Sequence, residues 1–224
     1  MTFDHEGHII VTPAEVEAML RTDIDWLICS VLFPGTPIVF ATYDEFCRFR
    51  AMVAEELSVH PSSIIFRGST NIGFSLTPRP EKAWMEVGAD SDVDLAVVDP
   101  DHFHFLDAEV RRWERNPAIK AQRFRGQGYV RSVKLRQSRA FYCYRYMDLP
   151  DTTLVQKYQA AMDKASSSHS PGCNRQVTAF FFRDWWSLHS RYEHDLRQLL
   201  HALRQPDFPA ADRQPRTRNG SVMP

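Results

Sequence analysis

The sequence predicts a soluble α+β domain, and three observations support that prediction. Short apolar, β-prone segments alternate with segments that show helical periodicity. Capping-box tetrapeptides precede two of the expected helices. The composition is ordinary for a globular protein, because 43% of the 224 residues are hydrophobic and 25% are charged. A chain of this length can bury a sizeable core.

The bulk properties exclude several classes of protein. The formal net charge of −1 excludes a molecule that attracts nucleic acid over its whole surface, so any nucleic-acid site would be a local patch. The four cysteines lie far apart and form no CxxC pair, which argues against a disulfide framework or a zinc site. No signal peptide or bilayer-spanning run is present. We therefore expect a cytoplasmic protein that does not interact with a membrane.

Capping signatures and periodicity predict the amino-terminal elements. Residues 9–11 form a short strand candidate, and the capping box that begins at Thr12 opens a helix to about Arg21. Residues 26–33 are apolar and β-prone, which predicts a strand that ends in the turn residues 34–37.

A second capping box, which begins at Thr42, predicts a helix with one apolar face. That face consists of Phe46, Phe49, Val53 and Leu57. Residues 64–66 predict a buried strand, and residues 74–88, with two prolines and no period, predict an insertion loop. Residues 93–98 predict a further strand, and Asp99 is placed to cap the helix that follows it.

The segment at residues 120–139 is basic, with seven Lys and Arg side chains and no acid. Residues 140–147 predict another strand, and residues 152–165 predict a helix. A last helix is expected to carry an apolar stripe. The stripe comprises Val177, Phe181, Trp185, Leu188, Tyr192, Leu199 and Leu203.

These elements predict three parts of the chain. Residues 1–150 form the core domain, and residues 151–204 form a helical C-terminal part that packs on it. Residues 205–224, rich in proline, arginine and small polar residues, are expected to be a disordered tail.

Two short segments carry the chemistry. Because alternate side chains of a strand share a face, Asp92 and Asp94 point the same way. Two carboxylates on one face require a positive partner, and magnesium prefers such oxygen ligands. The pair Gly68-Ser69 follows a strand and precedes an expected helix start. There, glycine allows a phosphate to approach the backbone, and the serine hydroxyl can bind a triphosphate oxygen.

The order of these segments resembles the signature of the DNA polymerase β-like nucleotidyltransferase superfamily. The residues that carry the resemblance are Phe66-Arg67-Gly68-Ser69 and Ser91-Asp92-Val93-Asp94-Leu95. It covers roughly residues 43–98, and it implies a small mixed sheet backed by helices with magnesium held by the aspartates. The spacer between the two segments is longer than is usual in the superfamily, because residues 74–88 are inserted.

The superfamily also has a third carboxylate on a later strand, and Asp148 is the best match to it. An alternative reading makes Asp148 a turn residue or helix cap before Pro150. The resemblance thus implies two Mg²⁺ ions, replaceable by Mn²⁺, and the following site. Its catalytic and metal-binding residues are Asp92, Asp94 and Asp148, and its nucleotide-binding residues are Arg67, Gly68 and Ser69.

The acceptor is the open part of the prediction. The chain looks like the stand-alone prokaryotic members of toxin–antitoxin and phage-defence systems, some of which have a partner protein encoded nearby. We expect transfer of NMP or dNMP from a nucleoside triphosphate to the 3′-hydroxyl of a nucleotide or nucleic acid. The alternatives are a toxin-like enzyme that modifies tRNA or a protein hydroxyl, and a degenerate module that only binds nucleic acid or a partner.

Overall fold

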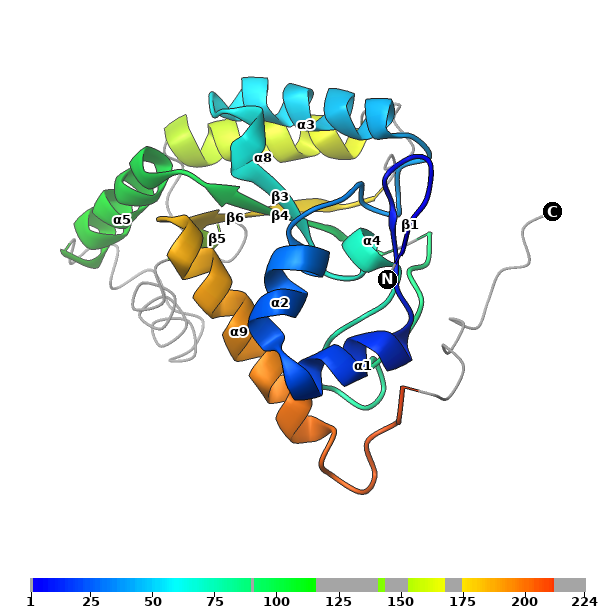
Figure 1. The fold of residues 1–224 in the computed structure, drawn as a ribbon. Helices are drawn as coiled ribbons and strands as arrows, with labels where there is room; N and C mark the ends of the chain where they lie inside the picture. Colours follow the sequence, from blue (N-terminus) through cyan, green and yellow to red (C-terminus); the bar gives the residue numbers. More distant parts are fainter. Residues whose placement is uncertain (1, 90, 116–140, 144–152, 168–174, 212–224) are drawn as a thin grey trace.

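A four-stranded mixed sheet organises the chain (Figure 1). Its strands, in the order β3-β4-β6-β5, are β3 (Ile64–Arg67), β4 (Val93–Val98), β6 (Val177–Phe182) and β5 (Phe141–Cys143). The central strands β4 and β6 are parallel, and each outer strand is antiparallel to its neighbour. The computed structural model describes residues 2–89, 91–115, 141–143, 153–167 and 175–211. The predicted α+β class with a small mixed sheet is confirmed.

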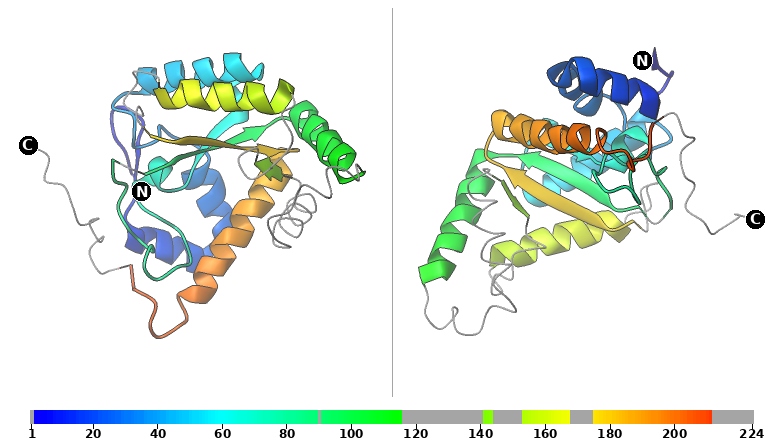
Figure 2. Two further views of the ribbon diagram at one scale, coloured as in Figure 1. Left: turned by 180° about the vertical axis from the view of Figure 1, so that it is seen from behind. Right: turned by 90° about the horizontal axis from the view of Figure 1, so that it is seen from below.

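Helices cover both faces of this sheet (Figures 1 and 2). The α-helices are α1 (Pro13–Thr22), α2 (Ile24–Leu27), α3 (Tyr43–Leu57), α4 (Ser69–Ile72), α5 (Pro100–Arg115), α8 (Thr153–Ser167) and α9 (Trp185–Ala202). A π-helical turn η1 (Ile28–Leu32), a 3₁₀ turn η2 (Pro61–Ser63) and a small hairpin of β1 (Thr2–Phe3) and β2 (Ile9–Ile10) complete the described elements. Helices α3 and α8 pack on one face, while α9, α1 and α2 pack on the other.

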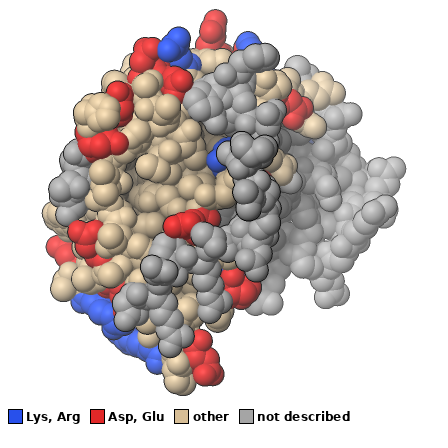
Figure 3. Space-filling view, turned by 90° about the vertical axis from the view of Figure 1, so that its right-hand side faces the viewer, with Lys and Arg blue, Asp and Glu red and all other residues tan. Residues whose placement is uncertain are grey.

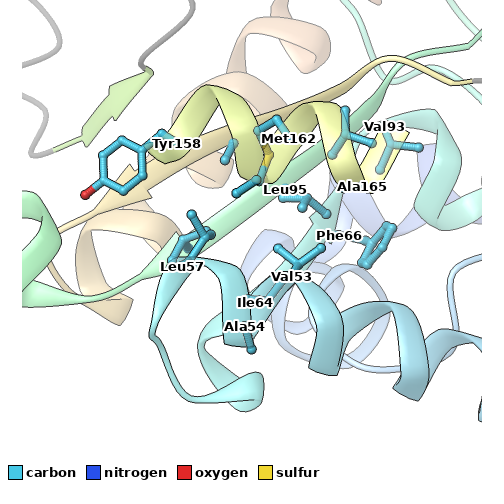
Figure 4. Close-up of a cluster of buried hydrophobic side chains, with 14 of the residues drawn as sticks. Val53, Ala54, Leu57, Ile64, Phe66, Val93, Leu95, Tyr158, Met162 and Ala165 are labelled. Carbon is cyan, nitrogen blue, oxygen red and sulfur yellow. The ribbon is translucent and has the colours of Figure 1, made fainter. Parts of the chain in front are cut away.

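The face under α3 and α8 forms the first core layer (Figure 4). Val53 and Leu57 of α3 meet Leu95 of β4 and Met162 of α8, and all four side chains are buried. The predicted apolar face of the α3 helix is therefore confirmed. Burial of this apolar area is the main favourable term in folding, at roughly 25 cal/mol per Å² removed from water.

The opposite face of the sheet forms the second core layer. It contains the side chains at the alternate positions of each strand, which point away from the first layer. Ala96 and Val98 of β4 pack with Phe182 of β6 and with Leu188 and Tyr192 of α9. The two layers divide β4 by alternation, as the period of a strand requires. The side chain at position 94 shares its parity with Ala96, so it lies on the α9 side of the sheet.

The prediction of a strand at residues 26–33 is wrong, because this segment is helical. Asp23 caps α2 by accepting a hydrogen bond from the backbone N–H of Trp26, and η1 continues the coil to Leu32. Leu27, Ile28, Val31 and Leu32 are buried at helical spacings. A short, mostly apolar run has no period that separates a buried strand from a buried helix, and tertiary packing decided between them.

The last helix was also predicted to begin too early. Val177–Phe182 is the strand β6, and α9 starts at Trp185 after the N-cap Asp184. Because β6 is buried on both faces, its residues form a continuous apolar run without alternation. The part of the chain after residue 150 therefore contributes a central strand of the sheet as well as helices.

The insertion at residues 74–88 is confirmed as irregular, apart from one isolated bridge between Phe74 and Glu86. Trp84 anchors it, since this side chain is buried and its indole N–H donates to the carbonyl of Pro209 at 3.1 Å. The N–H of Ala211 donates to the carboxylate of Glu17. Residues 205–211 thus pack on the domain, contrary to the disorder predicted from position 205.

Both predicted capping boxes cap their helices. Thr12 and Glu15 exchange reciprocal hydrogen bonds at the start of α1. Thr42 accepts from the N–H of Glu45, whose carboxylate accepts instead from Ala41. Within the described residues, no helix is both long and apolar enough to cross a bilayer.

Candidate active site

The two sequence segments singled out above meet at one end of the sheet. Strand β3 ends at Arg67, which is the register partner of Asp94 in β4. Gly68 follows with φ = +72° and ψ = −158°, a conformation that glycine adopts far more readily than other residues. A Cβ atom placed on Gly68 would lie 3.8 Å from Asp94 Oδ2. The Gly-Ser pair and the second aspartate are therefore neighbours in space.

A cavity of about 430 Å³, here called the aspartate cavity, opens beside this junction. The structure brings together Ser69, Asp92 and Asp94, which all line it. Asp92 is exposed and Asp94 is half-buried. The rest of the lining consists of Ser75, Glu81, Lys82, Met85, Glu86 and Ser91. Most of these residues belong to the 74–88 insertion, so the insertion forms a wall of the cavity.

Hydrogen bonds hold the segment that leads into Asp92. The Ser91 hydroxyl accepts from the N–H of Gly88 at 2.9 Å. The guanidinium of Arg175, just before β6, donates to the carbonyls of Gly88 at 2.5 Å and Ser91 at 3.2 Å. The position of Asp92 therefore depends on a residue that lies far from it in the sequence.

The donor set of the aspartate cavity suits a hard cation. Asp92 and Asp94 offer carboxylate oxygens, and Ser69 offers a hydroxyl, while Glu81 and Glu86 add negative charge. Magnesium is commonly held by one or two protein carboxylates together with water and substrate phosphates. Among the described residues, no group of three or more His, Cys, Asp and Glu side chains is arranged to hold a metal ion. The predicted third ligand, Asp148, lies outside the described residues.

The acidic character of this region is visible on the surface. Figure 3 views the side on which α4 and the start of β4 lie in Figure 1, and acidic atoms lie near the middle of that face, beside a hollowed area of uncharged residues. A polyphosphate entering such a region would be repelled unless a cation accompanied it.

A second cavity of about 410 Å³, here called the arginine cavity, adjoins the first. The two cavities share Ser69, Ser75 and Asp94 in their linings. The remaining walls come from the end of β3, from η1, from α4, from the insertion and from α9. They are Leu32, Arg67, Gly68, Asn71, Leu76, Thr77, Pro78, Arg191, Tyr192, Asp195, Leu196 and Gln198.

Arg67 lies in an unusual environment in this cavity. Its side chain is only 13% exposed, and the guanidinium lies over the rings of three aromatic residues at 5.1 to 5.6 Å. These rings belong to Phe180, Phe182 and Tyr192. Asp195 Oδ2 is 3.6 Å away, and the buried Nε has no hydrogen-bond partner among the described residues.

Helix α9 contributes the polar residues opposite Arg67. Asp195 forms an ion pair with Arg191, which lies one turn earlier on the helix, and the distance from Arg191 Nη2 to Asp195 Oδ1 is 2.9 Å. Burial raises the pKa of Tyr192 to about 12, although the neighbouring Arg67 acts in the opposite direction. The phenol is therefore a hydrogen-bond donor at neutral pH, and it donates to the carbonyl of Phe66 at 3.4 Å.

Sequence reasoning found Arg67, Gly68, Ser69, Asp92 and Asp94 but missed the contribution of α9. Tyr192 was assigned to the apolar stripe of the last helix, and it does pack in the core. The available signal was the pair Arg191 and Asp195, spaced for an ion pair on the helix face next to that stripe. Glu81 and Glu86 of the insertion could not be placed from the sequence, because the insertion shows no periodicity.

Comparison of the chain with protein-family models, with curated proteins and with solved structures found no match.

Proposed function

We propose that this protein is a magnesium-dependent nucleotidyltransferase that moves NMP or dNMP from a nucleoside triphosphate to the 3′-hydroxyl of a nucleotide or nucleic acid. The observation that supports the proposal is that Ser69, Asp92 and Asp94 line one cavity, while Gly68 lies next to Asp94. Phosphoryl transfer depends chiefly on positioning and on stabilisation of charge, and this arrangement offers both.

The Gly-Ser pair is suited to bind the phosphates of the donor. Gly68 has no side chain to obstruct an approaching phosphate, and its positive φ turns the backbone sharply after β3. Ser69 offers a hydroxyl at the shared edge of both cavities. Because α4 is a single turn, this grip rests on the hydroxyl and on backbone N–H groups rather than on a helix dipole.

The aspartates are suited to bind the metal. Asp92 and Asp94 provide carboxylate oxygens, and two protein carboxylates are enough for magnesium when substrate phosphates complete its shell. The bound ions, Mg²⁺ or Mn²⁺, would neutralise the charge of the triphosphate and of the transition state. Asp148 is proposed as the third carboxylate, which would help to deprotonate the attacking hydroxyl.

The test compares the wild type with Asp92→Ala/Asp94→Ala. The purified full-length chain is incubated with magnesium and each α-labelled NTP and dNTP, with and without oligonucleotides, and the products are resolved on a gel. We expect label in extended or condensed nucleotides for the wild type and at least about 100-fold less for the double variant. Asp101→Ala, which changes an exposed aspartate in the first turn of α5, serves as the matched control and should retain activity.

The other outcomes identify the alternatives. Label that moves onto a tRNA pool or onto the protein itself would favour the toxin-like transferase. Equal label for wild type and double variant would exclude these aspartates as catalytic groups. No label for either would favour a binding module, or an enzyme that requires a partner protein.

A further inference from the structure

The arginine cavity lies where an acceptor would have to bind, and we infer that it is the acceptor site for a small nucleotide with a terminal phosphate. This inference rests on the proposed function and names its acceptor class. Transfer requires the acceptor hydroxyl to lie beside the carboxylates and the α-phosphate of the donor. A molecule that fills the arginine cavity ends against Ser69 and Asp94, which also line the aspartate cavity.

The size and lining of the arginine cavity suit a nucleoside. A volume of about 410 Å³ lies within the range of small-molecule sites, roughly 300–1,000 Å³. Leu32, Leu76 and Leu196 offer apolar surface to a base or sugar. Hydrogen-bonding groups stand among them on Asn71, Thr77 and Gln198. This mixture of apolar walls with a few polar groups is typical of a site for a compact, partly polar ligand.

The charges of the two cavities differ in a way that assigns a ligand to each. The arginine cavity contains two guanidinium groups, Arg67 and Arg191, and two carboxylates, Asp94 and Asp195, so its formal charges balance. The aspartate cavity contains four carboxylates and one lysine. Of these two cavities, the arginine cavity is therefore the one without an excess of negative charge that would repel a metal-free phosphate, whereas the acidic cavity suits a metal-bound triphosphate.

The chemistry of Arg67 and Arg191 specifies a phosphate more closely than charge alone. A guanidinium presents several N–H donors in a planar fork that matches phosphate oxygens. The Nε of Arg67 is buried and has no partner among the described residues, so one donor of the fork is unsatisfied.

The experiment measures binding first, because a phosphate held by arginines needs no metal. The full-length chain is titrated with each nucleoside 5′-monophosphate and with the corresponding nucleoside by calorimetry in the presence of EDTA. We expect one monophosphate to bind at least 10-fold more tightly than its nucleoside. Arg191→Ala should weaken that binding at least 10-fold, and Gln198→Ala should weaken it less.

Arg197→Ala is the matched control. Arg197 lies on the same helix and forms an ion pair with Glu193 at 2.6 Å, one turn away, but it lines neither cavity. Its monophosphate affinity should equal that of the wild type. Thermal unfolding of each variant establishes that the fold is retained.

The transfer reaction separates this inference from the proposed function. With a labelled triphosphate donor, Arg191→Ala should raise the KM for the monophosphate acceptor at least 10-fold while the donor KM stays unchanged. Equal binding of nucleoside and monophosphate, or a variant that alters only the donor KM, would overturn the acceptor site but leave the transferase intact. Arg191-dependent binding without any transfer by the wild type would instead overturn the transferase, and with it the acceptor role.

Discussion

Arg67 and Asp94 lie opposite each other as register partners in the antiparallel strands β3 and β4. Both side chains are on the sheet face that α9 covers, and both line the arginine cavity. A guanidinium and a carboxylate directly across a strand pair stabilise each other. The candidate site is therefore built into the sheet rather than placed on loops alone. Substitutions in the site should change stability as well as activity, and the two effects can be measured separately.

Arg67→Met should lower the free energy of unfolding by about 1–2 kcal/mol, because the variant lacks the guanidinium that contacts three aromatic rings. Asp195 keeps its pair with Arg191, which limits the cost. Urea denaturation followed by circular dichroism measures the change. Arg183→Met, at an exposed ion pair with Asp184, should change stability by less than about 0.5 kcal/mol. Equal effects of the two substitutions would show that the aromatic cage contributes nothing.

Gly68→Ala should destabilise the fold by about 1–3 kcal/mol, because the conformation of residue 68 is strained for any residue with a Cβ. The added methyl group meets Asp94 Oδ2 at an ordinary contact distance of 3.8 Å, so the protein still folds. Nucleotidyl transfer should fall at least about 10-fold, because the methyl group occupies the path by which a phosphate approaches the backbone.

Gly73→Ala provides the comparison for that variant. Gly73 has φ = +91° at the other end of α4 and lines neither cavity. We expect a stability cost of about 1 kcal/mol and transfer rates close to wild type. If both glycine variants lose activity equally, the effect of Gly68→Ala comes from strain in α4 and not from the phosphate path.

Asp99→Ala should remove the N-cap of α5 at a cost of about 1 kcal/mol near pH 6. Burial raises the pKa of the Asp99 carboxyl, but hydrogen bonds at 2.9 Å from the backbone N–H and the ring of His102 outweigh it, so the pKa is lowered. A lowered pKa in the folded state means that this stabilisation is fully present above the ordinary pKa of about 3.9 and is lost as the pH falls through the folded value. The stability difference between wild type and variant should therefore shrink below about pH 4.

Denaturant unfolding at pH 6 and at pH 3 measures that difference. Asp101→Ala changes an exposed acid in the same first turn of α5 and serves as the control. A difference between wild type and Asp99→Ala that stays constant with pH would contradict the assigned role of the carboxylate.

Trp84→Phe should destabilise the protein by about 1–3 kcal/mol, because the indole N–H leaves a buried acceptor, the carbonyl of Pro209, without its partner. Since Trp84 anchors the insertion, proteolysis within residues 74–88 should also become faster. Urea denaturation and limited proteolysis measure the two effects. Trp185→Phe, at a half-exposed position, should leave both unchanged. An unaltered cleavage rate in Trp84→Phe would mean that the insertion is held by other contacts.

The candidate site was predictable where the position of a residue follows from the local periodicity of its strand. The alternation of β4 places Val93, Leu95 and Val97 in one core layer and leaves Asp94 on the other face, as a period of two requires. Gly68 was likewise singled out by its place after a strand, and its positive φ agrees with a sharp turn there.

Prediction failed where a short apolar run has no period that separates a strand from a helix. Residues 26–33 and 177–182 are both short, apolar and rich in β-prone residues, yet the first is helical and the second is a central strand. The hydrophobic effect is not directional, so such runs reveal only that they are buried. Neighbouring elements determine their conformation.

The sequence by itself therefore determined the α+β class, most helix starts and the sheet face of Asp94, because caps and periodicity are local properties. Only the tertiary structure decided that β6 lies beside β4, that Arg175 supports the approach to Asp92, and that Arg191 and Asp195 face Arg67 across the arginine cavity. These relationships join residues about 80 to 130 positions apart. They depend on which surfaces pack together, and no local pattern in the chain encodes that choice.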